Sequence, residues 1–199
     1  MPEFILHRAN NLGQSKLAEG FSGAEIDLRL YFGKVVLAHD PFTEGVSFTD
    51  WLSSFTGKFI ILNTKETGIE EEIVRIINSA APQIEYVFLD LPTPYLIKAA
   101  KNGIPVAVRV SEVEPIAFTS GIVSNWIWLD SFSGNWTHLE EIRTLRSSIP
   151  QKICLVSPEL QDRWPNTDPE EFEWLKLYLK ENSEHIQAIC TKNRSFWND

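Results

Sequence analysis

Cysteine and long apolar stretches are both scarce in this 199-residue sequence. Its two cysteines, Cys154 and Cys190, lie inside short apolar runs, which favours buried free thiols and argues against a disulfide framework. No segment approaches the ~20 apolar residues of a membrane-spanning helix. The N-terminal MPEFILHRAN has neither the basic start nor the apolar length of a signal peptide. We therefore expect a cytoplasmic protein with no membrane span.

Positive charge is also limited, because 18 lysines and arginines face 27 aspartates and glutamates, for a net charge of -9. A nucleic-acid-binding surface would show the opposite balance, so we expect no nucleic-acid partner. An acidic chain can still hold a local positive site for a small phosphate-bearing molecule. The composition, 43% hydrophobic and 23% charged, is typical of globular proteins, and the length predicts one domain over residues 1–199.

What the sequence does contain is a repeated unit: a short apolar run, a polar residue at its end, a loop, and a helical pattern. The apolar runs are Phe4–Leu6, Ala24–Leu30, Phe59–Leu62, Tyr86–Leu89, Pro105–Val108, Trp126–Leu129, Ile153–Val156 and Ala188–Cys190. Strands that alternate with helices predict a parallel sheet. Eight of them predict a compact, short-looped (β/α)8 TIM-type barrel. A doubly wound open sheet is the alternative, but no GxGxxG follows the first run.

Helix start signals precede four of the segments between these runs. Thr67, Thr93 with Pro94, Thr137, and Asp168 with Pro169 are expected to open the segments GIEEEIVRIINSA, YLIKAAKN, HLEEIRTLRSS and EFEWLKLYLKENS. Residues 15–21 and 48–55 are shorter helix candidates. Between the fifth and sixth strands, residues 115–124 leave room for a turn of helix only.

The segment AEIDLRLYFGKVVLAHDPF, residues 24–42, places two acidic side chains on one strand face. Glu25, Asp27 and Arg29 alternate with Ile26, Leu28 and Leu30, and a second extended run then ends at His39-Asp40. In a barrel the apolar face meets the helices, so the two carboxylates point inward, where unpaired charges are costly. A metal ion or basic partners would relieve that cost, and hard cations such as Mg²⁺ and Ca²⁺ favour oxygen ligands. A solvated strand face is the plain alternative.

Ionisable residues follow almost every predicted strand. They are His7, Arg8, Glu25, Asp27, His39, Asp90, Arg109, Asp130, Glu159 and Lys192, with Asn63 and Lys65 after the third parallel strand. Barrel enzymes build their sites at the C-terminal ends of the strands, so this pattern predicts a charged pocket at one rim. Trp128 lies two residues before Asp130, so both side chains point to the same face, and Trp128 would form the floor of the site below Asp130.

Four motifs in the first third of the chain carry a family resemblance. They are HR at residues 7–8, ExD at 25–27, HD at 39–40 and LNTK at 62–65. In this order they resemble the glycerophosphodiester phosphodiesterase family and the wider superfamily of phosphatidylinositol-specific and sphingomyelinase-D-type phospholipases. The match covers residues 4–65. The remainder agrees in strand rhythm and in the ending AICTKNRSFW.

The resemblance implies roles for the matching residues. His7 and His39 would be the general acid and base, because imidazoles titrate near neutral pH. Glu25 and Asp27 would hold one divalent metal ion, Mg²⁺, Ca²⁺ or Mn²⁺, that neutralises phosphate oxygens. Arg8 and Lys65, the basic residues of the matching motifs, would bind phosphate.

Two departures from the family pattern stand out. The family usually has a carboxylate where this chain has Asn63, so a third metal ligand loses its charge. Asp90 or Asp130 could compensate. The loop after HR also differs, because ANNLGQSKLAEGFSG stands where the family has a glycine and an acidic ENT motif.

The sequence therefore predicts a metal-dependent phosphodiesterase that cleaves a small, glycerophosphodiester-like substrate. One alternative is a degenerate barrel that binds a phosphorylated ligand without turnover, and Asn63 motivates it. Another is an aldolase or isomerase that uses Lys65 or Lys192 as a Schiff-base lysine. Trp128, Glu159 and Lys192 are predicted to line the substrate pocket.

Plain structural roles are expected elsewhere. Arg109 and Glu112 are predicted to form an ion pair, and His138 and His185 to lie on the surface. Trp51 and Trp174 are expected to pack on the barrel. Trp136 and Trp164 lie in predicted rim loops, where they either contact a ligand or pack against the loops.

Overall fold

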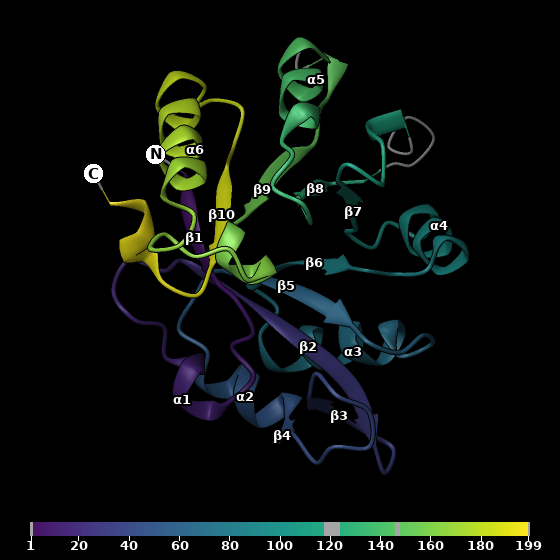
Figure 1. Cartoon of the computed structure of the whole chain (residues 1–199). Helices are drawn as coiled ribbons and strands as arrows, with labels where there is room; N and C mark the ends of the chain where they lie inside the picture. Colours follow the sequence, from purple (N-terminus) through teal and green to yellow (C-terminus); the bar gives the residue numbers. More distant parts are fainter. Residues whose placement is uncertain (1, 118–123, 146–147, 199) are drawn as a thin grey trace.

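The computed structural model describes residues 2–117, 124–145 and 148–198. Its framework is a curled sheet whose eight parallel strands match the predicted apolar runs (Figure 1). They are β1 (Glu3–Leu6), β2 (Gly23–Tyr31), β5 (Phe59–Thr64), β6 (Glu85–Leu89), β7 (Ala107–Val110), β8 (Trp126–Leu129), β9 (Lys152–Val156) and β10 (Ala188–Thr191). The prediction of a mixed α/β protein built on parallel strands is confirmed.

The parallel strands follow one another around a common interior. β1 pairs with β2 and β10, β2 with β5, and β5 with β6, while β7, β8, β9 and β10 pair in that order. In the described part of the chain, β6 meets β7 through one isolated bridge, from Phe88 to Val106. β2 and β5, by contrast, pair continuously from Gly23 to Leu28.

An antiparallel extension grows from β2. Beyond its parallel neighbours, β2 turns at Phe32-Gly33 and returns as β3 (Lys34–Leu37), which pairs with the two-residue β4 (Val46–Ser47). Gly33 has a positive φ of 76°, a conformation that suits glycine in a tight turn. The return of β3 brings residues 38–40 back to the level of Asp27, whose carbonyl accepts a hydrogen bond from the Ala38 amide.

Side chains at alternate positions along the strands belong to two different apolar clusters. On β2, Ala24, Ile26 and Leu28 join an outer cluster with helix residues such as Ile73 and Ile77. An inner cluster contains the alternate residues of the other strands, among them Ile5, Ile61, Ala107, Trp128, Cys154 and Cys190. Glu25 and Asp27 are fully buried on the inner side. The predicted inward direction of the two carboxylates is confirmed, as are the buried free thiols.

Helices surround the curled sheet (Figure 1). They are α1 (Leu12–Ser15), α2 (Phe48–Ser54), α3 (Glu70–Ala80), α4 (Thr93–Lys101), α5 (Thr137–Leu145) and α6 (Pro169–Glu181). The predicted helix at 15–21 is wrong, because Asn11 caps a single earlier turn by accepting from the Gln14 amide. The predicted Thr67 cap is also wrong: α3 begins at Glu70, whose carboxylate accepts from the Gly68 amide. Most of residues 115–124 lies outside the described residues.

Two packing predictions are wrong. His138 is buried, because it lies in the first turn of α5 beside Trp136 instead of on the surface. Trp174 is 43% exposed on α6 and stacks on Tyr178, whereas Trp51 is fully buried as predicted. None of the helices in the described residues is long and apolar enough to cross a membrane.

Candidate active site

A polar layer caps the apolar interior at the C-terminal ends of the strands. Five of its members lie two residues after an inner-cluster residue: His7 after Ile5, Asn63 after Ile61, Arg109 after Ala107, Asp130 after Trp128, and Lys192 after Cys190. Because strand side chains alternate between faces, this two-residue spacing directs them toward the interior side, except that Lys192 lies past the end of β10 and is exposed. The charged rim predicted from the sequence therefore exists as a layer above an apolar floor that includes Trp128.

Glu25 and Asp27 form the centre of this layer. Burial and, to a lesser extent, repulsion from Asp27 raise the pKa of Glu25 to about 7. The Arg8 backbone amide donates to Glu25 Oε2 at 2.8 Å, and Asn63 Nδ2 donates to Oε1 at 3.0 Å. Lys65 Nζ lies 3.0 Å from Asp27 Oδ1. The buried acids are thus compensated by donors from β1 and β5.

Asn10 is a member of the site that sequence reasoning missed. Its Nδ2 donates to Asp27 Oδ2 at 2.7 Å, and its Oδ1 accepts from the Asp27 backbone amide at 2.9 Å. This double contact fixes the loop after β1 against β2. The only signal in the sequence is that the loop departs from the family pattern at this point, which does not identify the residue.

Arg8 links the acidic centre to His39. Its Nε lies 3.8 Å from Asp27 Oδ2, and its Nη2 lies 2.9 Å from His39 Nε2. The backbone of Arg8 has a φ of 49°, in the left-handed region that non-glycine residues rarely adopt. Such local strain is common where a side chain must be held in a functional position.

The two neighbours of His39 define its tautomer. A guanidinium only donates, so His39 Nε2 accepts from Arg8. The proton therefore sits on Nδ1, which lies 2.9 Å from Asp40 Oδ1 and donates to it. Arg29 Nε also donates to the His39 carbonyl at 3.0 Å. His39 is a neutral, oriented imidazole whose free lone pair is covered by Arg8.

His7 is neutral for a different reason. Burial and, to a lesser extent, the nearby Arg8 charge lower its pKa to about 3. His7 Nε2 lies 3.7 Å from Glu25 Oε2, while Nδ1 has no hydrogen-bond partner among the described residues. A buried neutral imidazole with an unused nitrogen can accept a proton from a bound molecule.

The residues present do not fit the divalent metal ion that the sequence predicts. Within the described residues, no group of three or more histidines, cysteines, aspartates or glutamates is arranged to hold a metal. Asn63 turns its amide nitrogen toward Glu25, so the amide oxygen points elsewhere and is buried without a partner in the part of the chain that the structure describes. The Lys65 ammonium already lies against Asp27.

Asp90 and Asp130 do not join this centre, because both are bound by Arg109. Arg109 Nη2 donates to Asp90 at 2.7 Å and Nη1 to Asp130 at 2.5 Å. The predicted pairing of Arg109 with Glu112 is wrong: Glu112 instead accepts from the backbone amides of residues 132 and 133. Arg109 ties the ends of β6, β7 and β8 together.

Glu159 and Lys192 lie where β9 and β10 end. Glu159 is fully buried, and its carboxylate accepts from the Thr191 hydroxyl at 2.5 Å and the Lys192 amide at 2.9 Å. Lys192 is exposed, with its Nζ 5.3 Å from the centre of the Trp164 ring. Glu159 therefore orients the turn that carries Lys192 and has no free face toward the rim. Neither Lys65, paired with Asp27, nor the exposed Lys192 is a desolvated amine of the Schiff-base type.

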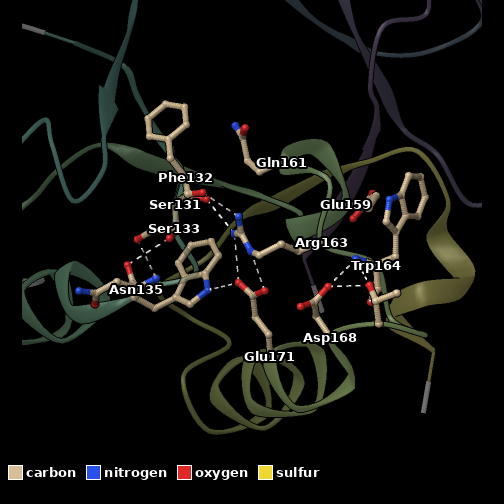
Figure 2. Close-up of polar contacts among 12 residues, drawn as sticks. Ser131, Phe132, Ser133, Asn135, Glu159, Gln161, Arg163, Trp164, Asp168 and Glu171 are labelled. Carbon is tan, nitrogen blue, oxygen red and sulfur yellow. Dashed lines mark hydrogen bonds and ion pairs between the residues drawn. The ribbon is translucent and has the colours of Figure 1, made fainter.

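Arg163 fastens the two loops that carry Trp136 and Trp164. Its guanidinium binds both carboxylate oxygens of Glu171, at 2.8 and 3.1 Å, and donates to the carbonyls of Ser131 and Phe132 (Figure 2). Trp136 is buried and donates from Nε1 to the same glutamate at 2.7 Å. Trp136 is thus a packing residue.

Two cavities open at the other end of the sheet, where the strands begin. Their volumes are about 420 and 540 Å³, and Phe59, Glu85, Trp126 and Lys152 line both. Phe59 and Trp126 stack with their ring centres 5.0 Å apart. The cavities lie away from both site histidines, so the polar layer is the better candidate for chemistry.

Comparisons with known proteins identify the fold. No family model matches the chain, and no curated protein matches it in sequence. Among solved structures, a glycerophosphodiester phosphodiesterase from Thermotoga maritima is similar with a TM-score of 0.64 and 15% identity, covering 96% of this chain and 95% of that one. A glycerol uptake operon antiterminator-related protein from Thermotoga maritima has a TM-score of 0.53 and 14% identity, covering 98% of each chain. At these identities the likeness shows a shared mixed α/β fold around curled parallel strands.

Proposed function

We propose that this chain cleaves a small phosphodiester, of the glycerophosphodiester type, by two-histidine acid–base catalysis. The observation that carries the proposal is the convergence of His7, Arg8 and Lys65 on one pair of buried carboxylates, with His39 in contact with Arg8. The fold shared with a glycerophosphodiester phosphodiesterase supports it. We also propose a single (β/α)8 barrel domain over residues 1–199 and a cytoplasmic location.

The two histidines suit opposite roles. Burial keeps His7 neutral, which is the form of a general base. His39 is more exposed and donates to Asp40, whose carboxylate would stabilise an imidazolium. We therefore assign the base to His7 and the acid to His39 in the first step, with the roles reversed in a second step.

Arg8 and Lys65 are proposed to bind the phosphate. A phosphate oxygen is a better acceptor for a guanidinium than an imidazole nitrogen, because the bond is assisted by charge. Arg8 would leave His39 when the substrate binds, and His39 Nε2 would then take a proton from solvent, which gives the imidazolium that acts as the acid.

The reaction balances without any further reactant than water. An oxygen nucleophile, either a neighbouring hydroxyl of the substrate or water, forms a new bond to phosphorus as the bond to the leaving oxygen breaks. The base takes the proton of the nucleophile, and the acid gives its proton to the leaving oxygen. Attack by a substrate hydroxyl produces a cyclic phosphate, and attack by water produces a phosphomonoester.

The test is turnover of bis(p-nitrophenyl) phosphate and of a glycerophosphodiester, with the products followed by phosphorus NMR. We expect His7→Asn and His39→Ala each to lower kcat by about 10²-fold or more. His185→Gln is the matched control, because His185 precedes β10 at the opposite end of the sheet. Turnover that survives both substitutions would contradict the proposal.

A second candidate function is binding of a phosphorylated ligand without turnover. The contact between Arg8 and His39 Nε2 favours it, because the acid–base nitrogen is occupied in the structure. The antiterminator-related neighbour also shows that this fold is not confined to one activity. This candidate predicts no turnover by the wild type and unchanged ligand affinity in His39→Ala.

A further inference from the structure

All four oxygens of the buried carboxylates face nitrogen donors of the protein itself. For Glu25 these are the Arg8 amide at 2.8 Å and the Asn63 amide group at 3.0 Å. For Asp27, Asn10 Nδ2 donates to Oδ2 at 2.7 Å, and Lys65 Nζ lies 3.0 Å from Oδ1 as an ion pair, although Oδ1 accepts no hydrogen bond from the described residues. A buried acid pair without such partners would be strongly destabilising.

Positive charge is already present at this centre. Two carboxylates meet the Lys65 ammonium and the Arg8 guanidinium, whose Nε lies 3.8 Å from Asp27. A Mg²⁺ or Ca²⁺ ion would need to approach Asp27 Oδ1 to ~2.1–2.6 Å. That position is next to the ammonium, so the ion could bind only after Lys65 moved away.

The orientation of Asn63 follows from the same chemistry. Two oxygens 3.0 Å apart repel each other unless a cation lies between them, so the amide turns its NH₂ group toward Glu25. A carboxylate at this position would have no such choice and would need a cation. Asn63 therefore completes the centre as a donor, whereas a metal ligand would have to accept.

We propose that the site binds and cleaves its phosphodiester without a divalent metal ion, with Lys65 supplying the cation at Asp27. This inference rests on the proposed phosphodiesterase function. Asn10 and Asn63 satisfy the carboxylate oxygens that a metal would otherwise bind. Lys65 then lies between Asp27 and the phosphate, where its three N–H groups reach both.

The first test is metal binding, which does not depend on turnover. Mn²⁺ is titrated into the full chain and followed by electron paramagnetic resonance. We expect no saturable binding by the wild type up to about 1 mM. In Asn63→Glu, which restores a third carboxylate, we expect at least about tenfold tighter binding. Wild-type binding that disappears in Asp27→Asn would overturn the inference, whatever the activity.

The second test is the source of the positive charge. We expect wild-type turnover to be unchanged by EDTA, and Lys65→Met to lose about 10²-fold in kcat. We expect added Mg²⁺ or Mn²⁺ to recover at least about tenfold of that loss, because the space beside Asp27 is then free. Lys58→Met, at the other end of β5, is the matched control. Far-ultraviolet circular dichroism verifies that each variant is folded.

The outcomes separate the two proposals. Wild-type turnover that EDTA abolishes and Mg²⁺ restores would keep the phosphodiesterase function and overturn the metal-free inference. Absent turnover with and without metal ions would reject the function, and the Mn²⁺ titration would still decide whether the centre holds a metal.

Discussion

Asp40 orients His39 although it lies on the surface, with its side chain 77% exposed. It accepts from His39 Nδ1, and this contact selects the tautomer whose Nε2 can exchange a proton. We expect Asp40→Asn to lower kcat by roughly tenfold, less than the 10²–10⁴-fold typical of losing an acid or base itself. Steady-state kinetics measure the loss, and Asp50→Asn on α2 is the control. An unchanged kcat would show that Arg8 alone orients the ring.

His138 should contribute to the pH dependence of stability. Burial lowers its pKa below the usual 6.5, so in mildly acidic solution the unfolded chain is protonated there while the folded chain is not. The unfolded state then binds more protons, and the free energy of unfolding falls as the pH drops below 6.5.

The measurement is urea unfolding of the wild type and His138→Phe at pH 7.5 and 5.5. The phenylalanine keeps an aromatic neighbour for Trp136 but removes the titration. We expect a smaller loss of stability between the two pH values in the variant, and a wild-type loss in His185→Gln. Equal losses in the wild type and His138→Phe would place the acid sensitivity elsewhere.

The sequence predicted site residues where a motif identified them and failed where a contact was specific to this chain. His7, Glu25, Asp27, Asn63 and Lys65 do meet at one end of the sheet. Asn10 could not be predicted, because its role depends on two hydrogen bonds to Asp27 across the loop after β1 and not on a sequence motif. Arg109 acquired different partners because Asp90 and Asp130 end the two strands beside it.

At the level of elements, Arg163 joins the loop after β8 to the first turn of α6. Both it and Glu171 are mostly buried, and the pair is bidentate (Figure 2). We expect Arg163→Met to lower the free energy of unfolding by about 2 kcal/mol, since it leaves a mostly buried carboxylate and two carbonyls short of donors. Arg163→Lys should recover little, because an ammonium cannot reproduce the fork.

Chemical denaturation measures both Arg163 variants. The matched control is Lys176→Met, which breaks a pair with the exposed Glu173 on the same helix and should cost no more than about 0.5 kcal/mol. A loss in Arg163→Met no larger than in this control would show that the loops are held by packing alone.

Strands were predicted better than helix ends. Eight apolar runs became eight parallel strands, because burial on both faces leaves a continuous signal in each run. The two-residue β4 has no such signal, and it forms only because β3 lies beside it. At the first turn of α3, the Glu70 carboxylate accepts a hydrogen bond from the Gly68 amide. The sequence does not distinguish this contact from a cap by the Thr67 side chain.

Across the part of the sheet that the structure describes, the contact between β6 and β7 is weak. β6 and β7 share the isolated bridge at Phe88 and Val106, supported by the Phe88 amide bonded to the Pro105 carbonyl at 2.9 Å. β2 and β5 share an unbroken ladder. Because local opening starts where few hydrogen bonds must break, we expect amides of β6 and β7 to exchange with deuterium before those of β2 and β5.

Hydrogen exchange followed by mass spectrometry tests this order under native conditions. Arg109→Met should widen the difference, since Arg109 joins the ends of β6 and β7 through Asp90. Uniform protection around the sheet would show that the contact between β6 and β7 is as stable as the continuous pairing of β2 with β5.

The length of β2 has a consequence for how this protein can diversify. Because the strand overshoots its neighbours and the chain doubles back through β3, His39 returns to the same rim as His7. Every group that we propose to act on phosphorus therefore lies between His7 and Lys65. The later strands, from β6 to β10, supply the opposite wall. On the proposed function, substitutions in β6 to β10 would therefore change the wall of the site without removing any group that acts on phosphorus.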